Sequence, residues 1–353
     1  MIIERGNIVH FTVFHTGSHP FLPLVVSVSF FPAKDVSLTI WNDQVIDSEK
    51  RRTGVLLVNY RQWPLTEKCI RSLLAGNPEN CLIGLVDNCS GDPPPEWIVE
   101  DPRILLHMND SNEGLTGANN KAYEMVVTKG VDYVFILNND TEVSPDTVNL
   151  LTEFLETSPE AGAASPAVLY ASHPDVVWSA GGRYSRTMMK LRQVYATVSE
   201  LPDDPVEMDQ VSGCAMMMRA DDYRRCGMQD PDLFVYYEDT DLCFRIRKQG
   251  LGVFLVPQAR VLHHVSISVG GVYSPFAVYF THRNRYIVAA RHLGFLSISL
   301  FTMYYIAVTL WKTAAYPLRG KAELVGSMWL GFLHGILNSP GRRPTRLFKE
   351  NQC

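Results

Sequence analysis

Hydrophobic and polar positions follow three different patterns along the chain. In residues 26–30 and 36–40, apolar residues alternate with small polar ones, which predicts the two strands of a β-hairpin. From residue 53 short apolar runs alternate with segments of helical spacing, and from residue 279 the chain becomes helical and apolar. These changes divide the chain into a β-rich N-terminal extension (1–50), a central domain (51–291) and a C-terminal helical region (292–353).

The central domain has the pattern of buried strands joined by helices. Apolar runs predict strands at residues 55–58, 82–86, 104–106 and 133–137, and helical spacing predicts helices at 66–75, 117–129 and 144–156. Continuous apolar strands that alternate with helices are typical of a parallel, doubly wound α/β sheet. Ligands bind such a sheet beyond the carboxyl ends of its strands, which is where Asp87 and Asp140 fall.

The composition is that of a folded protein. The 353 residues are 46% hydrophobic and 20% charged, with a net charge of −5. This apolar content excludes a disordered chain, and the acidic balance gives no support for nucleic-acid binding. The seven cysteines form no C-x₂-C pair, so a structural zinc site is not expected. The N-terminus has Glu4 and Arg5 and lacks an apolar run, so no secretory signal is expected.

Two polar clusters beyond predicted strands suit the binding of a nucleotide. Asp87 and Asn88 follow the strand at 82–86, where a carboxylate accepts hydrogen bonds from a ribose or a nucleobase, although an Asp-Asn pair is also common in turns. Gly114 and Gly117 allow close backbone approach, and the helix after them presents its N-terminus to an anion. This glycine loop matches neither the dinucleotide-binding fingerprint nor the Walker A loop.

A third cluster has the oxygen ligands of a metal site. The segment 137–142 places Asp140 just after an apolar strand, and such oxygen ligands suit Mg²⁺ or Mn²⁺ bridging a diphosphate, with turn and helix-cap chemistry as the alternative. His263 is the last residue of the extended segment 260–263, and His264 follows it. Neighbouring side chains of a strand point to opposite faces, so we expect at most one histidine to face a site.

A fourth cluster concentrates negative charge. Glu238, Asp239 and Asp241 lie within four residues. Repulsion between carboxylates raises a pKa, which suits a general base. The alternative is a helix N-terminus, where the helix dipole favours acidic residues.

In this order, the clusters resemble the family 2 nucleotide-sugar glycosyltransferases of the GT-A fold, in their bacterial rhamnosyltransferase-like branch. The resemblance covers residues 53–291 and is specific because eight motifs occur in order. The motifs are VLLVNYRQ (55–62), VDNCSGD (86–92), NEGLTGANN (112–120), FILNNDTEV (135–143), VSGCAMMMR (211–219), FVYYEDTDLCFRIRKQG (234–250), VLHHVSISVGG (261–271) and THRNRYIVAAR (281–291). The implied fold is α/β, a GT-A (Rossmann-like nucleotide-binding) domain with a mostly parallel central sheet, a β extension before it and helices after it.

Carried over position by position, the resemblance implies a role for each matching residue. Asp239 is implied as the general base with Glu238 as second choice, and Asp140 and His263 as the residues that approach a divalent metal, Mg²⁺ or Mn²⁺. Asn138 stands where the family usually has the first aspartate of its Asp-x-Asp element. The residues implied in binding the donor are Asn59, Asp87, Asn88, Gly114, Gly117, Asn119, Asn138 and Arg245.

The resemblance implies an inverting, metal-dependent transfer of a sugar. A nucleoside-diphosphate sugar is the implied donor, and the hydroxyl of a glycan or lipid-linked acceptor in cell-surface polysaccharide biosynthesis receives the sugar. Three alternatives remain. A sugar nucleotidyltransferase needs a glycine- and Arg/Lys-rich loop, which residues 59–63 do not supply. A degenerate binding or scaffold module is expected to lose its carboxylates. A processive synthase needs several membrane spans and a Gln-x-x-Arg-Trp motif.

The C-terminal region combines apolar helices with basic residues. Residues 293–311 contain no charged residue, and Lys312, Arg319 and Lys321 follow them. A second apolar segment at 324–337 precedes further basic residues. This combination suits an anionic cytoplasmic leaflet, so we expect a cytoplasmic protein bound peripherally to the cytoplasmic face of the membrane. A membrane span and a soluble helical pair are the alternatives.

Overall fold

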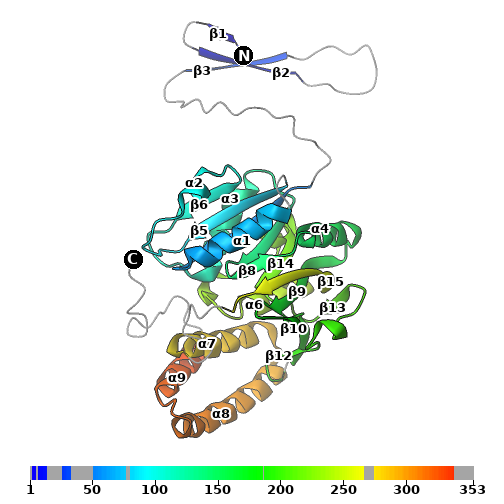
Figure 1. Cartoon of the computed structure of the whole chain (residues 1–353). Coiled ribbons are helices and arrows are strands. Elements are labelled where there is room, and N and C mark those ends of the chain that lie inside the picture. Colours follow the sequence, from blue (N-terminus) through cyan, green and yellow to red (C-terminus); the bar gives the residue numbers. More distant parts are fainter. Residues whose placement is uncertain are drawn as a thin grey trace. The chain divides into compact units, whose positions relative to one another are not determined.

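The structure is a computed structural model (Figure 1). It describes the strands within residues 2–4, 7–13 and 26–32, and residues 51–76, 80–185, 187–265 and 274–337. The chain divides into two compact units, Met1–Glu49 and Lys50–Cys353.

The first unit contains a three-stranded antiparallel sheet. Its strands are β1 (Ile2–Glu4), β2 (Asn7–Val13) and β3 (Val26–Pro32), in that order. The strand predicted at 26–30 is present as β3 and pairs with β2, while 36–40, the other strand of the predicted hairpin, lies outside the described residues. In β2 the sequence VHFTV has the same alternation of apolar and polar residues.

The second unit is built on a ten-stranded mixed sheet. Its parallel core has the strands predicted from the sequence, which are β4 (Thr53–Asn59), β5 (Cys81–Asp87), β6 (Ile104–Met108) and β7 (Tyr133–Asn138). The order in the sheet is β13-β15-β9-β14-β7-β4-β5-β6. Every residue of β4 is buried, because helices cover both faces of the sheet.

Different helices cover the two faces of this sheet (Figure 1). One face packs against α1 (Trp63–Gly76), α2 (Glu96–Glu100) and α4 (Thr147–Thr157). The other packs against α3 (Gly114–Val127), α5 (Ala220–Arg225) and α6 (Glu238–Lys248). Gly84 lets α3 approach the sheet closely, since a Cβ there would come 2.7 Å from the carbonyl oxygen of Ala122.

Six further strands extend the parallel core through both antiparallel and parallel pairs and bring distant segments to one edge. The longer ones are β9 (Ala161–Tyr170), β10 (His173–Ser179), β14 (Ala215–Arg219) and β15 (Gly252–His263), and the shorter ones are β8 (Thr141–Val143) and β13 (Val206–Met208). β14 pairs with β7, and β15 pairs with β8 so that His263 lies opposite Thr141. Two short strands, β11 (Gly182–Ser185) and β12 (Lys190–Gln193), form a separate hairpin.

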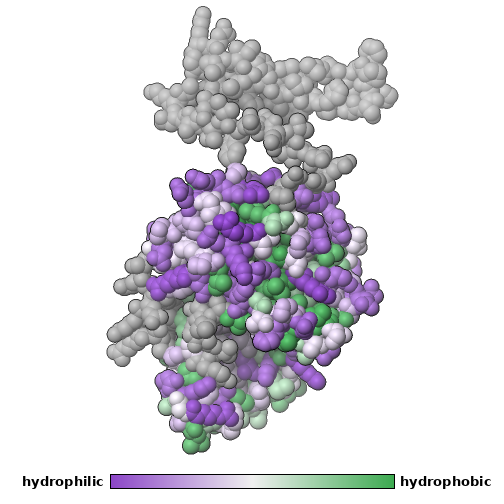
Figure 2. Space-filling model, in the orientation of Figure 1, coloured by the Kyte–Doolittle hydropathy of each residue, from purple (hydrophilic) through white to green (hydrophobic). Residues whose placement is uncertain are grey.

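Three helices complete the described chain. They are α7 (Pro275–His292), α8 (Phe295–Leu318) and α9 (Glu323–Ile336). Of the described helices, only α8 is long and apolar enough to cross a membrane, and 17% of its most apolar 18-residue window is buried. Figure 2 shows apolar, green side chains at the foot of the molecule, where these helices lie in Figure 1.

The contact between α9 and α7 depends on glycine, which generates a testable prediction. A Cβ at Gly331 would lie 2.4 Å from the carbonyl oxygen of Tyr279, whereas a Cβ at Gly326 meets no atom within 4 Å. We expect Gly331→Ala to lower the free energy of unfolding by about 1–3 kcal/mol. Gly326→Ala, the matched control, is expected to raise it by up to about 1 kcal/mol through helix propensity. Urea unfolding measures both, and equal stability of the two variants would contradict the packing described.

Candidate active site

The carboxyl ends of β4 and β5 form one wall of the site. Asp87, the last residue of β5, is fully buried. Its carboxylate accepts hydrogen bonds from Asn59 Nδ2 at 2.6 Å, from the Ser90 backbone N–H at 2.9 Å and from Ser90 Oγ at 2.5 Å. Asp87 therefore fixes the loop that follows β5. This loop and the end of β6 line a pocket of about 490 Å³, formed by Asp87, Cys89, Gly91, Asp92, Pro93, Met108, Asn109 and Asp110.

Asn88 connects this wall to the start of α3. Its Nδ2 donates to Asn112 Oδ1 at 2.8 Å, and its Oδ1 accepts hydrogen bonds from Asn109 Nδ2 at 3.0 Å and from the Glu113 N–H at 2.9 Å. A buried amide that bonds on both sides holds its neighbours in one arrangement. The loop at 112–114 is therefore fixed relative to the end of β5.

Gly114 brings α3 against the segment that precedes α6. Its φ is +80°, and a Cβ there would lie 2.3 Å from Phe234 Cδ2. Only glycine fits this position. Asn119, one turn further along α3, faces inward and donates to Gln229 Oε1 at 2.9 Å. Among the predicted donor-binding residues, Asp87 lines the pocket, while Gly114, Gly117 and Asn119 do not.

Asp140 and His263 meet where β8 pairs with β15. His263 Nε2 lies 3.1 Å from Asp140 Oδ1, and both side chains are buried. The Trp178 ring packs edge-on against His263, with ring centres 4.3 Å apart. His263 Nδ1 has no hydrogen-bond partner among the described residues. The sequence placed these two residues 123 positions apart, and the strand register brings them together.

The donor set at this point fits a divalent metal only in part. No group of three or more His, Cys, Asp or Glu side chains that could hold a metal ion occurs in the part of the chain that the structure describes. One carboxylate leaves coordination positions for diphosphate oxygens and water, which is the usual arrangement for Mg²⁺ in enzymes that use phosphates, whereas a histidine is not a usual ligand of Mg²⁺. The residues therefore fit a metal that protein and diphosphate hold together.

His264 points to a different partner from its neighbour, as adjacent residues at a strand end are expected to do. Its Nε2 lies 2.5 Å from Glu142 Oε1, and Lys68 Nζ lies 2.7 Å from the same oxygen. Burial alone would raise the pKa of Glu142, but the hydrogen bonds from Lys68 and His264 outweigh it and lower that pKa.

The segment before α6 has an unusual backbone. Phe234, Tyr236 and Tyr237 have φ values of +66°, +68° and +67°, in the left-handed region that costs non-glycine residues about 1–3 kcal/mol each. Asn284 of α7 holds this segment, because its Nδ2 faces the carbonyl oxygens of Leu233, Val235 and Tyr236 at 2.7, 2.8 and 2.8 Å. No pattern in the sequence marks Asn284 for this role, since it stands between Arg283 and Arg285 among other polar residues.

Glu238 and Asp239 follow directly, at the start of α6. Asp239 accepts hydrogen bonds from the N–H of Gly213 at 3.1 Å and of Thr240 at 2.6 Å. Glu238 is buried, and its Oε2 has no hydrogen-bond partner among the described residues. Burial, followed by repulsion from Asp239, raises the pKa of Glu238 to about 8. Burial also raises the pKa of Asp239, but its hydrogen bonds oppose the shift. The backbone hydrogen bonds favour the charged form of Asp239, whereas burial and the charge of Asp239 favour the protonated form of Glu238.

The carboxylate pair lies next to the end of β7. The N–H of Gly213 binds Asp239, and the carbonyl of the next residue, Cys214, accepts a hydrogen bond from the Asn138 N–H at 2.9 Å. Burial raises the pKa of Cys214, and the charges of both Asp140 and Asp239 act on it in the same direction. Gly213 and Cys214 thus connect Asp239 to Asn138, at the strand end that leads to the predicted metal ligand Asp140.

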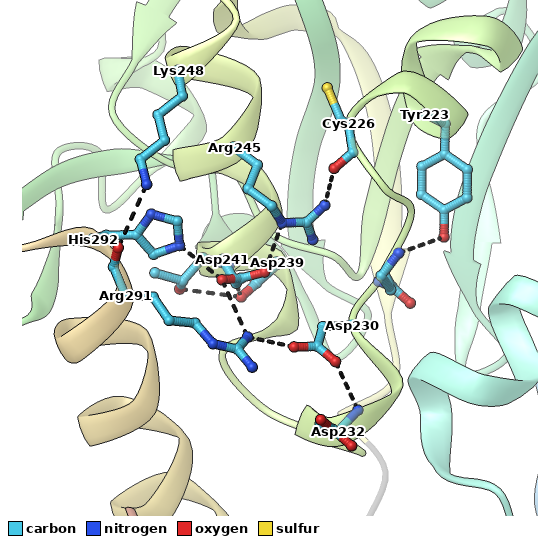
Figure 3. A network of polar contacts seen from close by, with 12 residues as sticks. Tyr223, Cys226, Asp230, Asp232, Asp239, Asp241, Arg245, Lys248, Arg291 and His292 are labelled. Atoms are coloured by element: carbon cyan, nitrogen blue, oxygen red, sulfur yellow. Dashed lines mark hydrogen bonds and ion pairs between the residues drawn. The ribbon is translucent and has the colours of Figure 1, made fainter. Parts of the chain in front are cut away.

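Arg245 belongs to the network that joins α6 to α7 (Figure 3). Its Nε donates to Asp241 Oδ2 at 2.8 Å, and its Nη1 donates to the carbonyl oxygen of Cys226. His292 Nε2 lies 2.8 Å from Asp241 Oδ1, and Arg291 bonds Asp230. Burial would raise the pKa of Asp241, but hydrogen bonds from His292 and Arg245 lower it overall. In this network Arg245 supports α6, and its contacts here are all within the protein.

Comparisons with known proteins agree on one family. Residues 55–225 match the model of glycosyl transferase family 2. The chain is 23% identical over 305 residues to the low-salt glycan biosynthesis hexosyltransferase Agl10 of Haloferax volcanii, covering 83% of this chain and 94% of that protein. It is 27% identical over 270 residues to the N-acetylglucosaminyl-diphospho-decaprenol L-rhamnosyltransferase of Mycobacterium tuberculosis, covering 68% and 85%.

A solved structure shows the same fold. The mannosyltransferase PcManGT from Pyrobaculum calidifontis, in complex with GDP-Man and Mn²⁺, superposes with a TM-score of 0.51 at 13% identity. The match covers 82% of this chain and 89% of that one. The predicted α/β fold of the GT-A class is thereby confirmed.

The raised pKa of Glu238 predicts how stability depends on pH. The folded protein keeps Glu238 protonated up to about pH 8, whereas the unfolded chain releases that proton near its ordinary value of 4.5. Stability is therefore lost as pH rises through this window. We expect Glu238→Gln, which stays neutral, to gain thermal stability relative to wild type between pH 5 and pH 8.5. Glu153→Gln, at an exposed position, is the control and should show no such gain. If the melting temperatures of wild type and Glu238→Gln differ by the same amount at every pH in this range, the raised pKa of Glu238 is contradicted.

Proposed function

Residues 55–225 form a glycosyltransferase family 2 domain, and on this premise we propose the reaction that the site performs. The chain transfers a sugar from a nucleoside-diphosphate donor to an acceptor hydroxyl, with inversion at the anomeric carbon. The observation that carries the proposal is the buried carboxylate pair at the start of α6, in which backbone hydrogen bonds favour the charged form of Asp239 and burial favours the protonated form of Glu238.

Asp239 is the general base of the proposed reaction. Its carboxylate takes the proton of the acceptor hydroxyl while the hydroxyl oxygen bonds to the anomeric carbon. The nucleoside diphosphate leaves from the opposite face of the sugar, so the configuration inverts. Glu238 keeps its own proton and so avoids a second negative charge next to Asp239. The backbone N–H groups of Gly213 and Thr240 fix the orientation of the Asp239 carboxylate.

Asp140 and His263 are the residues proposed to hold a divalent metal, Mg²⁺ or Mn²⁺. The side chains are buried, with Nε2 and Oδ1 3.1 Å apart, and the Asp140 carboxylate is the oxygen ligand that both ions prefer. When bound, such an ion neutralises the charge of the leaving diphosphate as a Lewis acid. Asn138 lies at the end of β7 in place of a second carboxylate.

The donor nucleotide is assigned to the pocket beside Asp87 and Asn109. Its residues are held by the amide network of Asn59 and Asn88, so the pocket is formed before the donor binds. Preorganised polar groups of this kind reduce the entropy lost when the donor binds. Arg245 acts on the same site indirectly, by holding α6 in place.

The acceptor is proposed to be a glycan carried on a lipid diphosphate, within cell-surface polysaccharide biosynthesis. The mycobacterial relative is named for a diphospho-decaprenol acceptor and for rhamnosyl transfer, and the archaeal relative for hexosyl transfer in glycan biosynthesis. We extend that acceptor class to this chain. The retained carboxylates disfavour a degenerate binding module, and the family match disfavours a sugar nucleotidyltransferase.

The helices at 292–353 are proposed to lie on the cytoplasmic face of the membrane, where 51–291 performs catalysis and 1–50 forms a separate β-rich extension. The support is the outer face of α8, where Leu296 is 71% and Met303 69% exposed. Leu300, Ile306 and Leu310 are also exposed and continue this stripe at helical spacing. Arg319 and Lys321 follow it and suit anionic headgroups.

Loss of the base should abolish transfer without loss of the donor. We expect Asp239→Asn to reduce the rate of sugar transfer by about 10²- to 10⁴-fold, because the amide cannot take the hydroxyl proton. Donor affinity should stay within about threefold, since the substituted group faces the acceptor. Asp221→Asn, on the exposed start of α5, serves as control. Transfer measured with a radiolabelled nucleotide sugar tests this, and turnover at the wild-type rate would rule out Asp239 as the base.

Membrane contact through α8 is tested with vesicles of phosphatidylcholine and phosphatidylglycerol. We expect the double change Leu296→Glu and Met303→Glu to reduce co-sedimentation of the full chain at least about tenfold, because burying each such side chain contributes about 1.5–3 kcal/mol. Val99→Glu on α2 is the matched control, since Val99 is 60% exposed and lies on another helix. Unchanged co-sedimentation of the double variant would contradict a membrane contact through this face.

A further inference from the structure

Basic side chains gather between α7 and α8 and at the start of β12. We call this group the Lys312 cluster, and its members are the cations Arg285, Lys312 and Lys190 and the neutral imidazole of His282. Lys312 Nζ lies 3.4 Å from His282 Nε2, and the Tyr305 hydroxyl lies 2.7 Å from the other ring nitrogen of His282. The Arg285 guanidinium lies 4.9 Å from the centre of the Tyr305 ring. His282 and Arg285 thus both contact Tyr305, and His282 connects this ring to Lys312.

The cluster has no acidic partner in the part of the chain that the structure describes. Arg285 is buried and donates to the carbonyl oxygens of Met188 and of Met189, the latter at 3.1 Å. Neither Arg285, Lys312 nor Lys190 forms an ion pair with a carboxylate of a described residue. Burial, with the charges of Arg285 and Lys190, lowers the pKa of Lys312. Burial, with the charges of Lys312 and Arg285, lowers the pKa of His282 to about 3.

Such an arrangement opposes folding unless something compensates the charge. Like charges in a partly buried position repel each other, and their desolvation is not repaid by an opposite charge. A cluster of titratable groups with shifted pKa values is a candidate binding site. An anionic ligand would supply the missing negative charge.

The position of the cluster specifies which anion fits. Tyr237 directly precedes the carboxylate pair, and its hydroxyl donates at 3.4 Å to the Met189 carbonyl oxygen that Arg285 also binds. On the other side, Lys312 belongs to α8 and follows the exposed Trp311. Moving outward from Asp239, the molecule therefore presents a base, then cations, then an apolar helix face. A sugar joined through a diphosphate to a lipid has its groups in the same order.

We propose that Lys312 and Lys190 bind the diphosphate of a lipid-linked acceptor, with the acceptor sugar toward Asp239 and the lipid along α8. Arg285 is a positioning residue, because it holds the turn at Met188 and Met189 that leads into Lys190. The inference rests on the acceptor class of the proposed function and assigns it a site.

Farnesyl diphosphate is the probe, and farnesol is its uncharged counterpart. Isothermal titration of the full chain should detect binding of farnesyl diphosphate and at least tenfold weaker binding of farnesol. We expect Lys312→Gln and Lys190→Gln each to weaken farnesyl diphosphate binding at least tenfold. Lys129→Gln, at an exposed position beyond the end of α3, is the matched control and should bind as wild type does. Affinities of the two cluster variants within twofold of wild type would overturn the proposal.

Thermal melting separates a binding role from a structural one. Lys312→Gln removes a charge that repels Arg285, so its melting temperature should equal or exceed that of wild type while binding is lost. A lower melting temperature together with lost binding would assign the lysine a structural role and overturn the proposal.

Two further arms identify the source of the anion and separate this inference from the proposed reaction. If Lys312→Gln loses binding to phosphatidylglycerol vesicles but keeps farnesyl diphosphate binding, the cluster binds membrane phospholipid and the proposal fails. Asp239→Asn should keep wild-type affinity for farnesyl diphosphate. If the protein binds farnesyl diphosphate through these lysines but transfers no sugar, the proposed binding site is supported and the proposed reaction is rejected.

Discussion

The arrangement of the site depends on one hydrogen-bonding side chain, the amide of Asn284. Three residues between 234 and 237 adopt left-handed backbone angles, at a cost that the local sequence does not offset. Asn284 binds three carbonyl groups of this segment, and Gly114 packs against its Phe234 ring. This segment sets where α6 begins and so where Glu238 and Asp239 lie. Although α7 lies outside the matched residues 55–225, its Asn284 holds the segment that leads into the proposed catalytic pair.

Burial then differentiates two neighbouring carboxyl groups. Glu238 has an oxygen without a partner and a pKa raised to about 8, whereas Asp239 accepts backbone hydrogen bonds that favour its charged form. One proton is thereby shared unequally, and each group has a separate role. A second pair, His263 and Asp140, forms because the register of β15 with β8 brings together residues that lie far apart in the chain.

The sequence predicts the parallel core well because buried parallel strands are continuous apolar runs, which local pattern is enough to detect. Which strands pair is harder to predict, because the pattern that marks β3 as a strand does not identify β2 as its partner. Side-chain partners are harder still. Charge alone does not say whether Arg245 binds a diphosphate or Asp241, although the spacing of four residues on a helix favours the latter. Asn284 acts on carbonyl groups about fifty positions away, which no local pattern reveals.

The close contact of α9 with α7 has a thermodynamic consequence. At Gly331 the two helices touch backbone to backbone, so α9 cannot shift without displacing α7, which carries Asn284. The free energy of the arrangement at α9 is therefore linked to that of the carboxylate segment. A partner that binds the C-terminal helices in one arrangement would therefore shift the conformations of the Asp239 segment. By reciprocity, a ligand bound near Asp239 would change the affinity of the helices for that partner by the same factor. Under the proposed function, such linkage would make the rate of sugar transfer depend on what the C-terminal helices contact.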